Sequence, residues 1–592
     1  MLRGDRSECG GECTLFNGLN REMKKSARTP VGLLVLVGWL AALGCAAPAA
    51  PTGQQGSAAQ PATAQTKHIT VAVLGDPPFI YTKINPRGTV GSADDMVDLL
   101  HVGLTHVDRA GVRGPRLASE VPTAENGLWQ IFPDGRMQLT WKIDPKAHWH
   151  DGTPVTAEDM VFTAKVVQDR DLPLLRERVY DLIESIEAPD SRTVVSTWKQ
   201  PYIEADALFT YALALPFPKH LLEAAHNEDK ATFFDHPYWN TEFVGAGAFR
   251  LKEFVRSSHM LLEANPDYVL GRPKIDQMEV KFIPDSNPLI TSLLAGTVDI
   301  AVGRNISLDQ AVQVRDQWRN GRMDIGLKSW HVLYPQFVNP NPEVVADVRF
   351  RRALLHGIDR EQLAETLVAG FSSVAHNYVN PQETEHQETD RNVARYEYDV
   401  RKAQQMIEEL GYQRGADGMF RGGSGQPLTV SMDATGALDI PPKAMFAVAD
   451  YWRRMGVEVE TSVVPIQLST NREHMSTFSS FQVSQNPDSK AYLTNFHSSN
   501  TPLPSNNFVG GNSPRYQNAQ WDSLLERYFT TVPIRERTEV LSQIVAHISD
   551  QLPLMGLFYN AEPTMINNRL QNAWARAHES GQGRNVHEWE VK

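Results

Sequence analysis

The sequence predicts a mixed α/β protein, and three observations lead to that prediction. Short runs rich in β-branched residues predict strands. Longer stretches between them place apolar residues at helical spacing. The chain has 592 residues, of which 41% are hydrophobic and 21% charged. This composition is typical of a globular protein, and the length is enough for about three domains of roughly 100 to 200 residues.

The strands and helices follow from local patterns. Thr156 is expected to cap a helix whose first turn holds Glu158 and Asp159, because acidic groups are favoured at a helix N-terminus. Asp399 is expected to cap another helix, which ends at Gly411. Strands are expected at 69–74, 193–198, 277–283 and 457–464, further helices around 521–528 and 541–548, and hairpin turns at 415–418 and 422–427.

The first 66 residues read as a targeting segment and a tether. An apolar run at 31–43 follows a basic stretch and is too short to span a bilayer, which is typical of a signal peptide. The run closes on Ala42-Leu43-Gly44-Cys45, which resembles a bacterial lipobox with Ala42 where leucine is usual. We therefore expect a signal peptide at 1–44, with Met23 as the true start, and lipid attachment at Cys45. The uncharged stretch 46–66 is expected to be a flexible linker.

Charge and cysteine content exclude several classes of protein. The chain carries 57 Lys and Arg against 70 Asp and Glu, a net charge of -13, which disfavours binding to nucleic acid. The three cysteines are Cys9, Cys13 and Cys45, so the expected folded part has no disulfide. An exported protein attached to the membrane only through Cys45 is expected, in the periplasm or at the cell surface.

Motifs for catalysis are mostly absent. The sequence has no G-x-S-x-G, H-E-x-x-H, P-loop or C-x-x-C pattern. We interpret 245–249 as a tight backbone turn rather than a dinucleotide loop, and His148 and His150 as structural rather than metal-binding. Asp94, Asp95 and the acidic residues around 383–388 are interpreted as solvated surface. No catalytic residue, metal or cofactor is expected.

One long stretch points to a family. Residues 149–162 (WHDGTPVTAEDMVF) resemble the signature of the family 5 extracellular solute-binding proteins, the receptors of oligopeptide, dipeptide and nickel ABC importers. The resemblance continues in chain order to residue 560, through segments at 245–249, 265–274, 294–300, 347–360, 398–418 and 516–522.

The resemblance implies a bilobed α/β clamshell of the type II periplasmic-binding-protein class, in the large peptide-binding group with an extra subdomain. Two strands are implied to cross between the lobes, near Ser329 and near Leu554. The expected division is lobe I at 67–328 plus 554–592, with an inserted subdomain at about 95–215, and lobe II at 329–553.

The resemblance also implies which residues contact the ligand. In peptide-binding members, an aspartate in an A-D-Y-x-x-P loop pairs with the amino terminus of the peptide. The matching stretch here is 483–489, in which Gln485 stands in the place of the aspartate and Asp488 is a substitute if the loop is shifted. A neutral amide cannot neutralise an ammonium group. The residues expected to contact ligand are Gln485, Asn486 and Asp488, followed by Tyr81, Trp330, Tyr378, Asn506 and Asn507.

Several functions remain open at this level. A non-enzymatic, monomeric receptor that delivers peptide-like ligands to ABC permease subunits is expected first, with oligosaccharides or other neutral ligands as the alternative. A secreted hydrolase and a sensory lipoprotein are the rivals from other classes.

Overall fold

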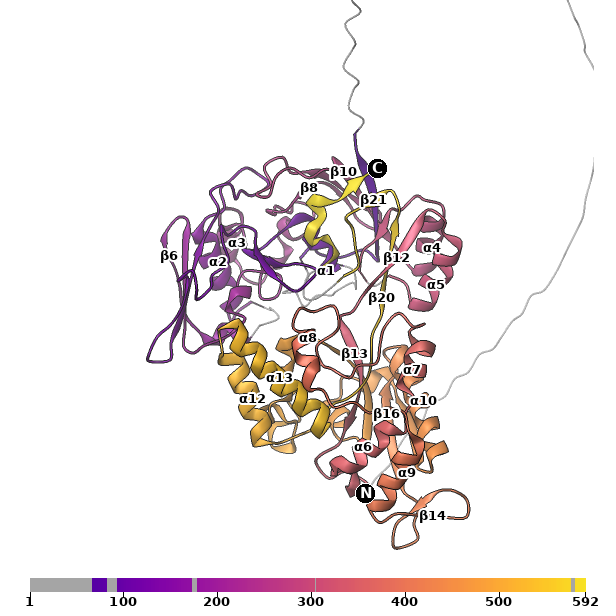
Figure 1. Ribbon diagram of the computed structural model, residues 1–592. Coiled ribbons are helices and arrows are strands. Elements are labelled where there is room, and N and C mark those ends of the chain that lie inside the picture. The colour runs from indigo at the N-terminus through magenta and orange to yellow at the C-terminus, as the bar shows by residue number, and fades with distance from the viewer. Residues whose placement is uncertain (1–65, 82–92, 173–177, 304, 577–580) are drawn as a thin grey trace, which may run out of the picture. The chain divides into compact units, whose positions relative to one another are not determined.

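The computed structural model describes residues 66–81, 93–172, 178–303, 305–576 and 581–592. The predicted signal peptide, Cys45 and nearly all of the linker lie outside the described residues. Sheets of seven, five and four strands carry the fold of the described part (Figure 1). The predicted mixed α/β class is confirmed. No helix within these ranges is long and apolar enough to cross a membrane.

The seven-stranded sheet is mixed. Its central strand β1 runs parallel to both β10 and β11, and its outer strands pair antiparallel. The expected strands at 69–74 and 277–283 are β1 and β10. Across the sheet the strands are β12 (Gly321–Gly326), β20 (Glu562–Asn567), β11 (Ile300–Ala301), β1 (His68–Leu74), β10 (Gln277–Ile283), β9 (His259–Ala264) and β8 (Phe249–Val255), with helices α1 (Ala93–Leu100), α4 (Ser286–Leu294) and α5 (Leu308–Gln317).

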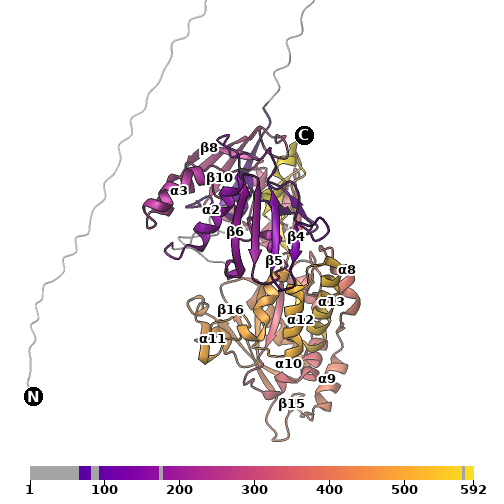
Figure 2. The ribbon, with the colours of Figure 1, turned by 90° about the vertical axis from the view of Figure 1, so that its left-hand side faces the viewer.

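The four-stranded sheet is antiparallel throughout and lies within the predicted inserted subdomain (Figure 2). Thr156 caps the helix that follows β5, as predicted, and its backbone N–H donates to Asp159 at 2.8 Å. Asp159 is buried and also accepts from Lys219 N at 2.9 Å, so this acidic residue has a structural role. The elements are β4 (Trp129–Ile131), β5 (Met137–Lys142), β7 (Thr193–Trp198), β6 (Ile183–Asp190), α2 (Ala157–Gln168) and α3 (Lys219–Glu228).

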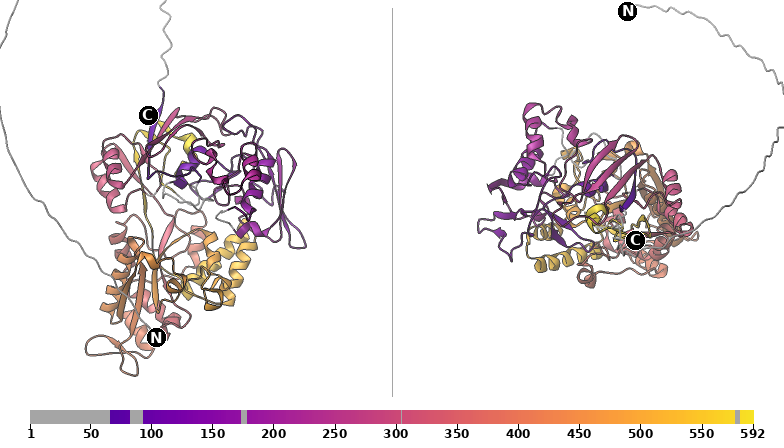
Figure 3. Two further views of the ribbon diagram at one scale, coloured as in Figure 1. Left: turned by 180° about the vertical axis from the view of Figure 1, so that it is seen from behind. Right: turned by 90° about the horizontal axis from the view of Figure 1, so that it is seen from above.

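The five-stranded sheet has helices on its flanks (Figure 3). Strands β17 and β18 both run parallel to β16, whereas β13 and β19 pair antiparallel. The helix capped by Asp399 and the two late amphipathic helices are present as predicted. The elements are β17 (Glu458–Val464), β16 (Thr429–Thr435), β18 (Phe481–Pro487), β13 (Ser329–Pro335), β19 (Met555–Tyr559), α6 (Val348–His356), α7 (Arg360–Leu367), α8 (His386–Thr389), α9 (Val400–Glu409), α10 (Ile440–Met455), α11 (Arg472–Ser476), α12 (Ala519–Thr530) and α13 (Ile534–Gln551).

Two-stranded pairs complete the described sheets. The turn at 415–418 joins the strands of one hairpin, as predicted, and Gly418 has the positive φ of 82° that such a turn requires. The pairs are β2 (Thr105–Val107) with β3 (Arg113–Pro115), β14 (Gln413–Arg414) with β15 (Phe420–Arg421), and β21 (Leu570–Gln571) with β22 (Glu590–Val591).

Strand β13 organises the core around the five-stranded sheet. All seven of its residues are buried, and alternate side chains of a strand point to opposite faces. Leu333 packs in the cluster that includes α6, α9 and α10. Trp330, Val332 and Tyr334 pack on the other face, in the cluster that includes α12 and α13. A strand buried on both faces needs apolar side chains at nearly every position.

The chain passes between the seven-stranded and five-stranded sheets at two places. The first passage is Leu327–Lys328, between β12 and β13. The second is Asn560–Ala561, between β19 and β20. Strand β19 begins at Met555 and belongs to the five-stranded sheet, so the second passage follows β19. The exact limits of the lobes stay a prediction.

The Gly245–Gly247 segment allows a close backbone contact rather than a nucleotide loop. A Cβ on Gly245 would lie 2.1 Å from the carbonyl oxygen of Leu100, and one on Gly247 would lie 2.4 Å from the carbonyl carbon. Gly247 N donates to that same carbonyl oxygen at 3.0 Å. Both glycines therefore let the chain before β8 lie directly against the end of α1.

We expect Gly245→Ala to destabilise the protein by about 1–3 kcal/mol, because the added methyl group must displace backbone. Thermal denaturation would show a lower melting temperature. Gly423→Ala is the matched control, since a Cβ at Gly423 has no heavy atom within 4 Å. Equal melting temperatures of the two variants would contradict the packing role of Gly245.

Candidate ligand-binding site

The carboxyl ends of three parallel strands meet at one edge of the five-stranded sheet. These strands are β16, β17 and β18. In open α/β sheets, ligands bind outside the carboxyl ends of the strands. Strand β18 ends at this edge with Gln485, Asn486 and Pro487, and Asp488 follows directly. The edge is therefore the candidate ligand-binding site.

Five of the eight predicted ligand residues come together here. Trp330 on β13 pairs with Asn486 on β18 in the strand register. The ring of Tyr378 lies edge-on to Trp330, with centroids 5.4 Å apart and planes at 81°. The Tyr378 hydroxyl donates to Ser489 O at 2.8 Å, next to Asp488. Gln485 completes the group.

Most of these polar groups already have partners within the chain. The Asn486 amide donates to the Tyr334 hydroxyl, and its oxygen accepts from Ser484 Oγ at 3.1 Å. Trp330, Tyr378 and Asn486 are at most 3% exposed. Gln485 is half-buried, and its Nε2 donates to Ser329 Oγ at 3.0 Å. Among the three predicted residues from β18 onward, Gln485 is thus the accessible one.

The other three predicted residues lie apart from this group. Tyr81 is buried in the core around the seven-stranded sheet, and its hydroxyl accepts from Leu215 N at 3.1 Å. Asn506 accepts from Leu503 N at 2.9 Å, which holds a short 3₁₀ helix. Asn507 is exposed, with a left-handed φ of 52°. All eight ligand assignments stay predictions.

A buried ionic cluster lies behind the candidate site. One Asn380 amide nitrogen donates to Asp488 at 2.7 Å and to Glu383 at 3.0 Å. The Lys490 ammonium group contacts Glu383 directly and lies 3.3 Å from Glu385. Two carboxyl groups therefore pair with the ammonium group, and the Asn380 amide links the third, Asp488, to Glu383. The expectation that the acidic residues around 383–388 are solvated surface is wrong for Glu383, which is 7% exposed.

Burial sets the protonation of the cluster. Removal from water raises the pKa of Asp488 to about 7, with Glu383 adding to the effect. Burial also raises the pKa of Glu383. For Lys490, burial works against the charged form, but Glu383 and Glu385 outweigh it and hold the pKa above its ordinary value. The lysine therefore stays charged, while Asp488 titrates near neutral pH.

The cluster also holds the first passage between the sheets. Asp488 N donates to Lys328 O at 3.3 Å, and Leu327 N donates to the Gln382 side chain at 3.3 Å. At the second passage, Asn560 N donates to Ser329 O at 2.8 Å. The loop that holds Asn380 and Gln382 thus links the end of β18 to the chain between β12 and β13.

Sequence reasoning missed Asn380, Gln382 and Glu383, which share one loop, and Lys490, which lies 107 residues after Glu383. It also misplaced Asp95, which is fully buried, lies 3.4 Å from Arg576 and accepts from Gln582 N at 3.0 Å. Nothing in one sequence shows these pairings. A buried acidic residue and an exposed one look alike until their partners are placed.

The histidines of the H-x-H motif have structural contacts. His150 Nδ1 accepts from Gly245 N at 3.2 Å, and Nε2 contacts Gly247 O at 3.1 Å. Burial lowers the pKa of His150 to about 3, so the ring is neutral. No group of three or more potential metal-ligating residues is found in the part of the chain that the structure describes.

Comparison with known structures identifies the class of fold. The oligopeptide-binding protein AppA from Bacillus subtilis, solved with a nonapeptide, matches 89% of this chain and 99% of its own, with a TM-score of 0.61 and 22% identity. The periplasmic EDTA-binding protein EppA matches 89% of this chain and 97% of its own, with a TM-score of 0.69 and 17% identity. The fold is that of the type II periplasmic binding proteins, as predicted.

Sequence comparison then gives the family. The model for "Bacterial extracellular solute-binding proteins, family 5 Middle" matches residues 119–503. The chain belongs to this family, which consists of binding receptors rather than enzymes. Over 502 residues it is 24% identical to the Bacillus subtilis oligopeptide-binding protein AppA, covering 83% of this chain and 86% of that protein. The chain is a solute-binding receptor of the class that serves ABC importers.

We expect Asp488→Asn to stabilise the protein at pH 8 by a few kcal/mol, because each unit of raised pKa corresponds to about 1.4 kcal/mol. The folded-state pKa of Asp488, about 7, lies above the unfolded value of about 3.9. Asp488 therefore costs stability progressively as pH rises between these two values. In urea unfolding, the gain in the free energy of unfolding should reach its full value above pH 7 and vanish near pH 4. Asp439→Asn, at a side chain 65% exposed, is the control, and a pH-independent gain would contradict the assignment.

Proposed function

We propose that this protein captures a peptide-like ligand between two lobes and delivers it to the permease subunits of an ABC importer. The observation that carries the proposal is the family match over residues 119–503, which includes the candidate edge at the end of β18. The B. subtilis relative AppA is described as oligopeptide-binding, which supports a peptide-like ligand.

One feature of the site favours a second class of ligand. Gln485 is the accessible side chain at the end of β18, and it is a neutral amide already bonded to Ser329. Asp488 is buried and bonded to Asn380 rather than exposed at the edge. Neither of these two side chains therefore offers an exposed carboxylate that would neutralise an ammonium group. Oligosaccharides, blocked peptides and other neutral ligands are therefore the second candidate.

We expect protein purified from Ala46 onward to carry a trapped ligand that mass spectrometry of the denatured material identifies. The same compound should raise the melting temperature saturably without being converted to product. A free-amine peptide would support the first class and exclude the neutral one, while a sugar or blocked peptide would do the reverse. Product formation without saturable stabilisation would contradict the receptor function.

We further propose that Cys45 carries a lipid that holds the exported protein at the membrane. The support is the apolar run at 31–43 followed by Leu43-Gly44-Cys45, and a linker without charged residues that separates Cys45 from β1. At roughly 5–6 Å times the square root of residue number, such a linker spans about 25 Å.

Cys45→Ser should move the protein from the membrane fraction to the soluble extracytoplasmic fraction. It should also abolish labelling by a fatty-acid probe, because the thiol is the attachment atom. Fractionation followed by immunoblotting measures the first effect. Ser57→Ala, in the linker, is the control and should leave both unchanged. Continued labelling of Cys45→Ser would place the lipid elsewhere.

A further inference from the structure

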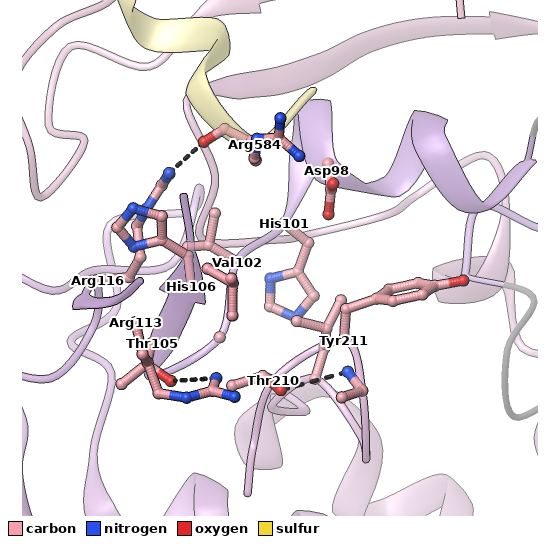
Figure 4. Close-up of a pocket in the computed structure, with 14 residues that line it drawn as sticks. Asp98, His101, Val102, Thr105, His106, Arg113, Arg116, Thr210, Tyr211 and Arg584 are labelled. Carbon is pink, nitrogen blue, oxygen red and sulfur yellow. Dashed lines mark hydrogen bonds between the residues drawn. The ribbon is translucent and has the colours of Figure 1, made fainter. Parts of the chain in front are cut away.

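A small cavity with both apolar and charged side chains in its wall lies among α1, the β2–β3 hairpin, the loop after Phe209 and the C-terminal segment (Figure 4). Its volume is about 50 Å³. A single buried water needs roughly 10–15 Å³ measured in this way. The space therefore suits one small polar group and excludes a ring or a whole dipeptide.

Three arginines supply the positive charge of the wall. Arg116 is 4% exposed and donates to the Tyr268 hydroxyl at 2.5 Å and to the carbonyl of Arg584. Its Nε has no hydrogen-bond partner in the described part of the chain. Arg113 lies 3.0 Å from Asp206 and donates to Thr105 Oγ1 at 3.2 Å. Arg584 also lines the cavity. Of the charged side chains that line the cavity, three are arginines and one is Asp98, so the lining itself carries a net positive charge.

Asp98, on α1, is the acidic group that lines the cavity. Its Oδ2 is covered and has no hydrogen-bond partner among the residues that the structure describes. Burial raises its pKa to about 7, and Asp95 adds to the effect, while Arg116, Arg584 and Arg576 oppose it. With a pKa of about 7, the Asp98 carboxyl group is protonated as pH falls below neutral. Its protonation removes a negative charge from the cavity.

The histidines nearby do not change this balance. His101 contacts Pro216 O through Nε2 and accepts from Ala246 N through Nδ1. His106 contacts Gly114 O through Nδ1. Burial lowers the pKa of His101, His106 and His587 to about 4 each. All three rings are neutral at physiological pH, so Asp98 is the group that titrates there.

We propose that this cavity is a binding subsite for one carboxylate group, held by the guanidinium groups of Arg113 and Arg116. Planar guanidinium groups bind carboxylates through charge-assisted hydrogen bonds. A cation is opposed by three arginines. The carboxylate is either a free small acid or the end of a longer solute. The subsite deepens the proposed function by naming one chemical group of the solute, and its role in import rests on that function.

Isothermal titration of the full-length protein in detergent with sodium acetate tests the subsite. We expect saturable binding that strengthens as pH falls from 8 to 6, because protonation of Asp98 removes the repulsion of the bound anion. Acetate itself stays ionised over this range. Sodium sulfate at matched ionic strength should bind more weakly, since removal of a doubly charged ion from water costs more free energy than removal of acetate.

Two variants should move the affinity in opposite directions. Arg113→Gln should weaken acetate binding about tenfold through loss of one charge-assisted contact. Asp98→Asn should strengthen it about tenfold at pH 8, remove the pH dependence and match wild type near pH 6. A gain of affinity cannot come from misfolding. Arg109→Gln, on the same hairpin and 49% exposed, is the control and should bind like wild type.

Competition experiments distinguish the two sources of the carboxylate, a free small acid and the end of a longer solute. If N-acetyl-trialanine competes with acetate and its amide does not, the group is the end of a longer solute. Competition by free small acids alone identifies a free acid. Absence of saturable acetate binding in wild type and Asp98→Asn, or equal binding of sulfate, would overturn the proposal. Acetate binding in a protein that carries no solute would leave the subsite standing and contradict the import function instead.

Discussion

The structure depends on how the chain crosses twice between two sheets. The first crossing, Leu327–Lys328, lies between β12 and β13, and the second, Asn560–Ala561, lies between β19 and β20. Strands β12 and β20 pair in the seven-stranded sheet, and β13 and β19 pair in the five-stranded one. Because both crossings join the same pair of sheets, each sheet must be completed by segments far apart in the chain. This constraint brings the end of β18 next to the first crossing.

That position explains why buried charge gathers there. The Asn380 amide joins Asp488 to Glu383, Lys490 offsets part of their charge, and Asp488 N bonds the backbone of Lys328. Buried ionised groups are costly unless paired, and removal of one partner leaves the other exposed to that cost. The cluster therefore links the protonation of one carboxyl group to the backbone of a crossing strand. A second buried aspartate, Asp95, forms an ion pair with Arg576 and holds the C-terminal segment against α1.

Much of the fold follows from local patterns. Strand periodicity placed β1, β7, β10 and β17, and the caps Thr156 and Asp399 begin helices where their side chains predict. These features depend on neighbours within a few residues. Trp330, Tyr378 and Asn486 meet only through strand register and a loop contact, which no local pattern of the sequence shows. Tyr81, Asn506 and Asn507 lie elsewhere, since a position in a loop does not specify which way the loop folds.

The sequence by itself determined the α/β class, the family resemblance and the helix caps, because each depends on residue type at short spacing. Only the tertiary structure decided that Asp95 and Glu383 are buried, that β19 belongs to the five-stranded sheet, and that Arg113, Arg116 and Asp98 surround one cavity. Burial and charge pairing depend on partners tens to hundreds of residues away. The free-energy cost of burying a charged acidic side chain, and hence its pKa, depends on those partners and not on its neighbours in the chain.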